Sequence, residues 1–191
     1  MNVCVYGASS SAIDKVYIEA VEELGEVIAE RGHAVVFGGG ASGSMGAAAR
    51  GARRRGGAVI GIAPTFFNVD GVLFPDCTEF ISPETMRERK KLLEEKSDGF
   101  VITPGGIGTY DEFFEILTLK QLGRHNKPIV IYNVDGYYNP MLAMLADAME
   151  KSFVMESVGE LYAVLTDAEA VVRYIEEYDD PQREVNFYKK V

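Results

Sequence analysis

The sequence predicts a single α/β domain in which a parallel sheet carries helices on both faces. Short apolar segments, rich in β-branched residues, alternate along the chain with longer segments of helical periodicity. Two of the apolar segments run directly into glycine-rich loops. At 191 residues, with no internal repeat or linker, the chain has the length of one domain. We therefore expect a Rossmann-like, doubly wound domain over residues 1–178 and a polar C-terminal tail at 179–191.

Seven segments are expected to be strands. Each is short, mostly apolar and bounded by glycine, proline or polar residues, as the buried strands of a parallel sheet are. In chain order they are residues 2–6, 34–37, 58–62, 78–81, 99–103, 128–132 and 162–165. The segment 64–75 fits neither period and is expected to be a loop.

Six segments are expected to be helices, because their apolar residues recur three and four positions apart. They are residues 14–31, 45–55, 83–96, 109–122, 139–151 and 167–178. Gly32 follows the first helix as a glycine that ends it. For the third helix, Ser82 is the expected N-cap and Pro83 the expected first helical residue.

Composition excludes several functions. The 19 Lys and Arg and 29 Asp and Glu give a formal net charge of −10, which disfavours binding to nucleic acid or to an anionic membrane surface. No apolar run reaches the length of a membrane helix, and the first residues have no basic n-region, so no signal peptide is expected. Two cysteines predict reduced thiols and a cytoplasmic protein, and two histidines make a histidine-rich metal site unexpected.

The first glycine-rich loop, 38–46, contains the spacing G-x-G-x-x-G. It follows the second expected strand, and no acidic residue occurs until Asp70, so the pattern disfavours a dinucleotide oxidoreductase. Two interpretations remain. The loop is either a tight turn that needs positive φ angles, or a contact in which backbone N–H groups bind a phosphate or sugar.

The second loop, 104–109, leads from a strand into a helix. Its glycines allow close approach of a ligand, and the helix N-terminus offers free N–H groups to an anion. No lysine follows at the spacing of a P-loop. Glu112 lies three residues after Thr109, so the two residues are either a capping box or part of a site. Glu115 is on the same helical face as Glu112, so the two glutamates together are either part of a site or a solvated helix face.

A charged segment, 86–91, precedes this loop. Taken alone it is typical of the solvated outer face of a helix. Together with the glycine loop, however, it resembles the Lonely Guy (LOG) family of cytokinin riboside 5′-monophosphate phosphoribohydrolases, long misannotated as lysine decarboxylases. The motif M-x-x-R-K spans residues 86–90, and the motif P-G-G-x-G-T-x-x-E spans residues 104–112. The resemblance covers nearly the whole chain and includes the loops 7–10, 38–46 and 133–139.

The resemblance implies a Rossmann-like fold, a homo-oligomer that is at least a homodimer with its site near the interface, and no cofactor or metal. It implies hydrolysis of the N-glycosidic bond of a nucleoside 5′-monophosphate. By position, Arg89 and Glu112 match the catalytic pair. The matching nucleotide contacts are Lys90, Gly105, Gly106, Gly108 and Thr109, with Thr118 as a further contact, and the two other glycine-containing loops add Ser10, Gly39 and Gly40.

The segment 64–84 departs from the plant pattern and lacks its acidic substrate contact, so AMP and an N6-prenylated relative both remain candidate substrates. The main alternative is a non-catalytic carrier of a nucleotide or of molybdenum cofactor. The presence of both Arg89 and Glu112 favours the enzyme. A pyridoxal-dependent decarboxylase is rejected, because no lysine lies in a recognisable cofactor-binding context.

Overall fold

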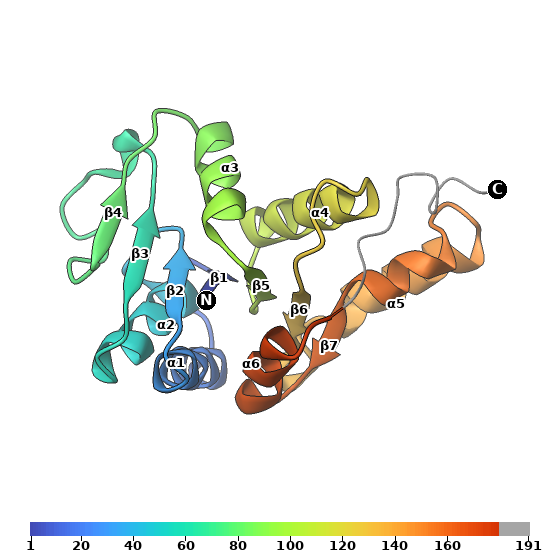
Figure 1. Cartoon of the computed structure of the whole chain (residues 1–191), viewed down its shortest axis with the longest axis horizontal. Coiled ribbons are helices and arrows are strands. Elements are labelled where there is room, and N and C mark those ends of the chain that lie inside the picture. Colours follow the sequence, from blue (N-terminus) through green and yellow to red (C-terminus); the bar gives the residue numbers. More distant parts are fainter. Residues whose placement is uncertain (180–191) are drawn as a thin grey trace.

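The computed structural model describes residues 1–179, and these form one domain around a seven-stranded parallel sheet (Figure 1). The strand order is β4-β3-β2-β1-β5-β6-β7, and every neighbouring pair is parallel. The predicted α/β class and the doubly wound parallel sheet are therefore confirmed. Of the expected C-terminal tail, residues 180–191 lie outside the described part of the chain.

The predicted strands are all present, with small differences at their ends. They are β1 Asn2–Tyr6, β2 Ala34–Phe37, β3 Val59–Ile62, β4 Glu79–Ile81, β5 Gly99–Ile102, β6 Ile129–Tyr132 and β7 Ala163–Leu165. The predicted helices are also present, as α1 Lys15–Glu30, α2 Gly43–Arg54, α3 Met86–Lys96, α4 Ile107–Gln121, α5 Asn139–Glu150 and α6 Ala168–Glu176. Short 3-10 turns occur at Thr65–Phe67, Val134–Gly136 and Glu156–Leu161.

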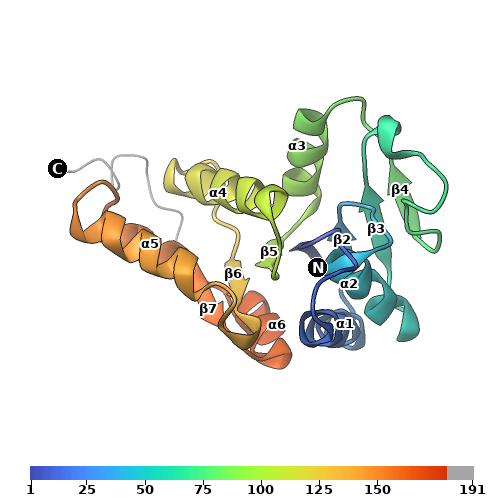
Figure 2. The same cartoon turned by 180° about the vertical axis from the view of Figure 1, so that it is seen from behind.

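Two apolar cores lie on opposite faces of the sheet, because successive side chains of a strand point to opposite sides. In β1, Val3 and Val5 pack against α1, α2 and α6, whereas Cys4 and Tyr6 pack toward α3, α4 and α5. Figures 1 and 2 show α1, α2 and α6 on one side of the strands and α3 and α4 on the other. The helices thus cover both faces, as predicted.

The order of the strands determines where a ligand can enter. From β1 the chain adds β2, β3 and β4 in one direction, and β5 then pairs with the opposite edge of β1. The loops that follow β1 and β5 consequently leave the sheet in opposite directions and open a crevice between them. In doubly wound sheets this switch point is where ligands bind.

The start of α3 differs from the prediction. Ser82 and Pro83 lie outside the helix, and the carbonyl of Pro83 accepts a hydrogen bond from the Thr65 amide. The N-cap is Thr85, whose hydroxyl accepts from the amide of Glu88 while the Glu88 carboxylate accepts from the amide of Thr85. This reciprocal capping box satisfies two free amides at the helix start, which a proline at the first turn cannot do.

The segment 64–75, expected to be a loop without regular structure, is tied to the first glycine loop. It contains the 3-10 turn Thr65–Phe67, and Leu73 forms an isolated antiparallel bridge with Gly40. The amide of Ala41 donates to Val72 O and the amide of Phe74 donates to Gly39 O. These backbone hydrogen bonds place the segment beside the crevice, which no sequence period could indicate.

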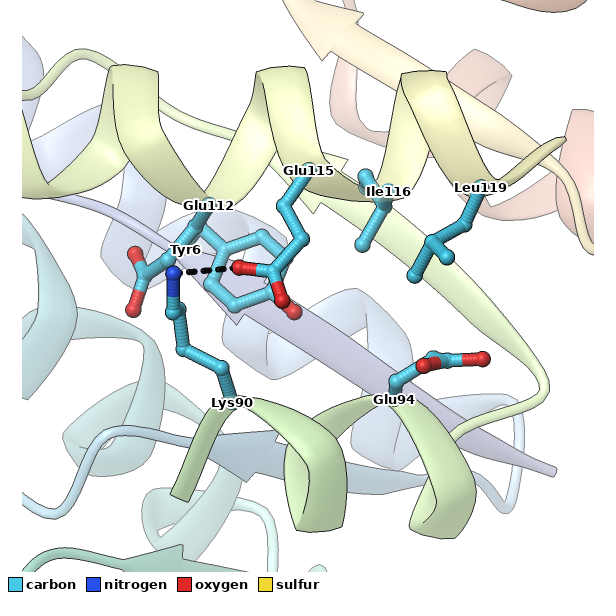
Figure 3. Close-up of a pocket in the computed structure, with 7 residues that line it drawn as sticks. All are labelled: Tyr6, Lys90, Glu94, Glu112, Glu115, Ile116 and Leu119. Atoms are coloured by element: carbon cyan, nitrogen blue, oxygen red, sulfur yellow. Dashed lines mark ion pairs between the residues drawn. The ribbon is translucent and has the colours of Figure 1, made fainter. Parts of the chain in front are cut away.

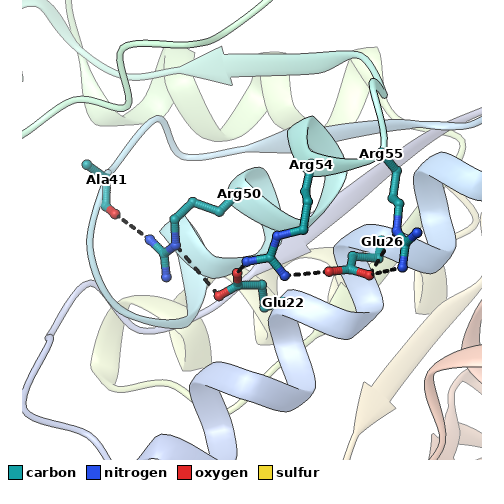
Figure 4. A network of polar contacts seen from close by, with 6 residues as sticks. All are labelled: Glu22, Glu26, Ala41, Arg50, Arg54 and Arg55. Carbon is teal, nitrogen blue, oxygen red and sulfur yellow. Dashed lines mark hydrogen bonds and ion pairs between the residues drawn. The ribbon is translucent and has the colours of Figure 1, made fainter.

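The helices α1 and α2 pack closely, because glycines lie at their contact. A Cβ on Gly25 or Gly51 would overlap the backbone of the opposite helix. Around this contact, arginines of α2 reach carboxylates of α1: Arg54 pairs with Glu22 and Glu26, and Arg55 with Glu26 (Figure 4). The close contact positions the start of α2 at the edge of the crevice.

Among residues 1–179, no helix combines the length and apolar character needed to cross a bilayer.

Candidate active site

A pocket of about 530 Å³ occupies the crevice at the carboxyl ends of the strands. This volume is within the range of small-molecule sites. Five segments line it: the loop after β1, the glycine loop after β2, the segment 64–75, the start of α3 and the start of α4. Of the predicted site residues, six line the pocket: Arg89, Glu112, Gly40, Gly106, Gly108 and Thr109.

Arg89 and Glu112 form a buried ion pair on the wall of this pocket. Arg89 Nη1 donates to Glu112 Oε1 over 2.7 Å, and only 7% of the surface of each residue is exposed. The residues are 23 positions apart and lie on different helices, α3 and α4. Charged residues are rarely so buried, and a paired, hydrogen-bonded arrangement is what makes their burial tolerable.

Two further contacts fix the guanidinium. Arg89 Nε donates to the carbonyl of Ile62, at the end of β3, over 3.2 Å. A Cβ on Gly38 would overlap Nη2, so the glycine at that position makes room for the arginine. The interpretation of residues 86–91 as a solvated helix face does not apply to Arg89, because its side chain is buried against α4.

Glu112 does not cap a helix. The N-cap of α4 is Gly106, so Thr109 and Glu112 both lie inside the helix, and the carboxylate is directed to Arg89. Burial raises the pKa of Glu112 above the ordinary value of a glutamate, and the adjacent Arg89 guanidinium opposes this rise. A carboxylate with a raised pKa is a stronger base than an exposed one.

The loop 103–106 brings the start of α4 to the pocket. Gly106 and Gly108 are exposed there, and a Cβ on either would meet no other atom within 4 Å. Gly105 is buried instead, and a Cβ on it would overlap Thr109 and approach the amide of Ala8 to 3.0 Å. Gly105 therefore serves close packing, whereas Gly106 and Gly108 leave space for a ligand at a helix N-terminus, where an anion is favoured.

In the first glycine loop, the tight turn and the lining of the pocket fall to different residues. Gly38 and Gly40 line the pocket together with Ser42 and Met45, next to the start of α2. Gly39 has φ +78°, is buried, and is not among the lining residues. The tight-turn interpretation thus describes Gly39, and its neighbours carry the backbone to the pocket wall.

Lys90 is beside the pocket but is engaged elsewhere. Its amine lies 3.0 Å from Asp111 Oδ2 and also pairs with Glu115, both on α4. Figure 3 shows a second, much smaller pocket between α3 and α4, in which Lys90 extends from α3 to Glu115 of α4. Glu112 comes from the same helix as Glu115, and Tyr6 lies between α3 and α4. These contacts raise the pKa of Lys90 and give Glu115 a partner. The two neighbouring residues Arg89 and Lys90 therefore both join α3 to α4.

Two predicted contacts lie away from the pocket. Ser10 is exposed in the loop after β1, and its hydroxyl accepts a hydrogen bond from the amide of Ala12. Its neighbours Ala8 and Ser9 line the pocket in its place. Thr118 is exposed on the outward face of α4, three helical turns beyond the glycine loop.

The pocket has an apolar wall that sequence reasoning missed. Phe67, Val72 and Leu73 come from the segment 64–75, and they face the site with Met45 and Met86. The signal was present, because six large apolar residues in a segment expected to be a loop need a reason to be there. Within residues 1–179, no cluster of three or more His, Cys, Asp or Glu side chains is arranged to hold a metal ion.

Comparisons with known proteins fit this site. The family model described as "Possible lysine decarboxylase" matches residues 45–175. A probable cytokinin riboside 5′-monophosphate phosphoribohydrolase of Oryza sativa subsp. japonica, LOGL9, is 39% identical over 176 residues, which are 92% of this chain and 78% of that protein. The cytokinin riboside 5′-monophosphate phosphoribohydrolase LOG7 of Arabidopsis thaliana is 33% identical over 177 residues, 93% of this chain and 82% of that protein.

Solved structures share the architecture. The molybdenum cofactor binding protein of the phototrophic bacterium Rippkaea orientalis matches with a TM-score of 0.69 at 20% identity, covering 92% of this chain and 93% of that one. The molybdenum cofactor carrier protein of Chlamydomonas reinhardtii matches with the same score at 22% identity, covering 93% of this chain and 98% of that one. At these identities the likeness shows the fold alone.

Proposed function

Because this chain belongs to the LOG family of cytokinin riboside 5′-monophosphate phosphoribohydrolases, we propose that it hydrolyses the N-glycosidic bond of a nucleoside 5′-monophosphate. The products are the free base and ribose 5-phosphate. The observation that carries the proposal is the buried pair of Arg89 and Glu112 on the wall of a nucleotide-sized pocket, beside the start of a helix. A carrier that leaves its ligand unchanged has less need of such a pair.

In the proposed reaction, the bond between C1′ and the base breaks and its electron pair leaves with the base. The oxygen of a water molecule forms a new bond to C1′, one water proton leaves that oxygen, and the base takes up a proton. The sugar passes through a state of oxocarbenium character, whose positive charge a nearby carboxylate stabilises. We assign Glu112 this role and that of general base toward the water, which its raised pKa supports.

Arg89 keeps Glu112 ionised and in place. A buried carboxylate without a cation would take up a proton and lose its charge. The guanidinium uses Nε for the Ile62 carbonyl and Nη1 for Glu112. Its planar fork can serve both partners at fixed angles, which a lysine cannot do.

The 5′-phosphate is assigned to the start of α4. The exposed residues 106–108 leave open space at the first turn, where backbone N–H groups and the helix dipole favour an anion. The start of α2, through Ser42 and Met45, borders the same pocket. The apolar wall at Phe67, Val72 and Met86 is then left for the base, and it suits adenine as well as an N6-prenylated adenine.

We further propose that the enzyme is a homodimer that pairs through α4. Besides the side chains that it buries, this helix has apolar residues that are exposed or only partly buried, namely Ile107, Tyr110 and Phe114, and Leu122 follows at its C-cap. Ile107 is 85% exposed, which is unusual for an isoleucine. Thr118 is exposed on the same helix. In the proposed dimer it would therefore contact the nucleotide that is bound in the pocket of the partner subunit.

Sedimentation equilibrium tests the dimer. We expect a mass near 42 kDa, twice the 21.0 kDa of one chain. Leu122→Glu, at the C-cap of α4, should shift the mass toward one chain, whereas Val16→Glu on α1 should leave it unchanged. A wild-type protein that sediments as one chain would exclude the dimer.

A cytoplasmic location is part of the proposal and is supported by two cysteines that are both free.

The function itself is tested by product analysis. Purified protein is incubated separately with AMP, N6-isopentenyladenosine monophosphate and adenosine, and the free bases are resolved by chromatography. We expect base from the monophosphates and far less from adenosine, and the ratio of the two monophosphate rates identifies the preferred base. A parallel preparation of Glu112→Gln controls for contaminating hydrolases. Tight binding of nucleotide with no base released would favour the carrier.

A further inference from the structure

The backbone of the loop 103–105 is held from the side away from the pocket. Three successive carbonyl groups each accept a hydrogen bond from a buried or half-buried hydroxyl. Tyr138 Oη donates to Thr103 O over 2.7 Å, Ser44 Oγ donates to Pro104 O over 3.0 Å, and Tyr137 Oη donates to Gly105 O over 2.6 Å. None of these six residues lines the pocket, whereas 106–109, which follow, all do.

The hydrogen bond of Tyr137 has a direct consequence for the pocket. In a planar trans peptide the C=O and the N–H point in opposite directions. The Gly105 carbonyl shares its peptide with the amide of Gly106, so holding that carbonyl on the far side directs the Gly106 N–H toward the pocket. Glycines flank this peptide on both sides, and glycine backbone rotates more freely than that of other residues. Without a fixed carbonyl the peptide could turn over and present an oxygen to an anion.

The two tyrosines are themselves held by a specific turn after β6. Asp135 and Gly136 have φ angles of +49° and +69°, a conformation that aspartate and glycine tolerate better than most residues. The side chain of Asn133 accepts from the amide of Tyr138 over 2.8 Å and donates to Asn139 over 2.9 Å. The turn therefore delivers both hydroxyls to the glycine loop.

The rings of the tyrosines are also supported. They pack edge to face on one another with centroids 4.9 Å apart, and Tyr17 of α1 packs edge to face on Tyr137. Tyr138 is fully buried and Tyr137 is half-buried. Burial raises the pKa of both phenols, so both remain protonated donors over the physiological range.

We propose that Tyr137 is a positioning residue for phosphate binding: its hydroxyl fixes the Gly105 carbonyl so that the Gly106 amide faces the 5′-phosphate. Tyr138 supports it by fixing the carbonyl of Thr103, two residues before Gly105. This inference rests on the proposed function for the identity of the anion. It goes beyond that function by assigning the orientation of the anion-binding backbone to a residue outside the pocket.

Tyr137→Phe tests this assignment, because it removes the hydroxyl and keeps the ring contacts. Binding of ribose 5-phosphate and of adenosine is measured by titration calorimetry, and KM and kcat are measured with AMP. We expect about fivefold weaker binding of ribose 5-phosphate, the size of one lost hydrogen bond. Adenosine binding should be unchanged, and KM for AMP should rise more than kcat falls. The melting temperature should change by less than about 3 °C.

Tyr162→Phe is the matched control. Tyr162 is half-buried, its ring packs on Phe113, and it makes no hydrogen bond to the glycine loop in the described part of the chain. We expect it to bind both ligands as the wild type does.

The assignment is overturned if Tyr137→Phe binds ribose 5-phosphate as tightly as the wild type, or if binding of adenosine falls equally. It is also overturned if wild-type protein does not bind ribose 5-phosphate. Because ribose 5-phosphate is not turned over, its titration is independent of the reaction. A wild type that binds it but releases no base from AMP would contradict the proposed function and leave the fivefold comparison valid.

Discussion

Nη1 of Arg89 lies 2.7 Å from Oε1 of Glu112, and this ion pair joins α3 to α4 at the wall of the pocket. The pair is the chemical centre of the site, because Glu112 is the one carboxylate among residues 1–179 that is both buried and in contact with the pocket.

Glu112→Gln should abolish most turnover without unfolding the protein. The amide keeps the shape of the side chain and can still accept from Arg89, but it has no charge and no basicity. General-base and charge-stabilising groups contribute about 100-fold or more, so we expect kcat to fall by at least that factor. Steady-state assays with AMP and a thermal melt measure the two effects.

Glu115→Gln is the matched control, since it makes the same change one helical turn further along α4 at a residue that does not line the 530 Å³ pocket. Its activity should stay within about twofold of the wild type. Equal losses in both variants would mean that α4 is sensitive to any loss of negative charge.

Arg89→Ala should cost both activity and stability. Removing the guanidinium leaves Glu112 buried without a cation, and breaking a buried pair in this way costs about 3 kcal/mol. Urea unfolding at neutral pH measures the loss. The deficit should shrink as the pH falls, because a protonated Glu112 needs no partner. The double variant Arg89→Ala with Glu112→Gln should recover part of the stability and none of the activity, and a purely additive result would show that the two residues are not coupled.

Two glycines of one loop should respond in opposite ways to alanine. Gly108→Ala adds a methyl group that meets no other atom within 4 Å, and alanine favours a helix over glycine by up to about 1 kcal/mol. We expect a stable protein whose KM for AMP rises about tenfold, because the methyl group narrows an anion site at the helix start. Unchanged KM would place the phosphate elsewhere.

Gly105→Ala should instead lower stability by about 1–3 kcal/mol, since its Cβ would overlap Thr109 and crowd the amide of Ala8. Thermal melts of both variants provide the comparison. If Gly105→Ala melts like the wild type, the close approach of this backbone to its neighbours is not required for the fold.

His125 should make stability fall at mildly acidic pH. Its ring is buried, Nε2 lies 2.9 Å from the Ile116 carbonyl, and burial lowers its pKa to about 4. In the unfolded chain a histidine titrates near pH 6.5. Between these values the unfolded chain binds one more proton, so the contribution to stability is complete above about pH 6.5 and is lost as the pH falls toward 4.

The variant His125→Gln isolates this effect, because glutamine can donate to the same carbonyl and does not titrate. Unfolding free energies from pH 7 to pH 4 should fall less steeply for the variant, by up to about 1.4 kcal/mol per pH unit. Parallel curves for the two proteins would show that other groups, such as the surface carboxylates, cause the acid sensitivity.

The agreement between sequence and structure is closest where one local pattern determines the outcome. Short, mostly apolar runs predicted all seven strands, and helical periodicity predicted all six helices. The predicted start of α3 was wrong. Ser82-Pro83 and Thr85 with Glu88 both resemble helix starts, and only the reciprocal hydrogen bonds between Thr85 and Glu88 show that the helix begins after Thr85. The segment 64–75 had no period because it is held by bonds to a distant loop.

The sequence by itself determined the alternation of strands and helices, the two glycine loops and the motifs that contain Arg89 and Glu112. These are properties of neighbouring residues, so hydrophobic period and spacing suffice to read them. Only the tertiary structure decided that Glu112 pairs with Arg89 instead of capping α4, that Lys90 binds Asp111 and Glu115, and that Tyr137 holds Gly105. Each of these contacts joins residues 21 to 32 positions apart. The order of the strands and the packing of the helices bring such residues together, and no local period records that geometry.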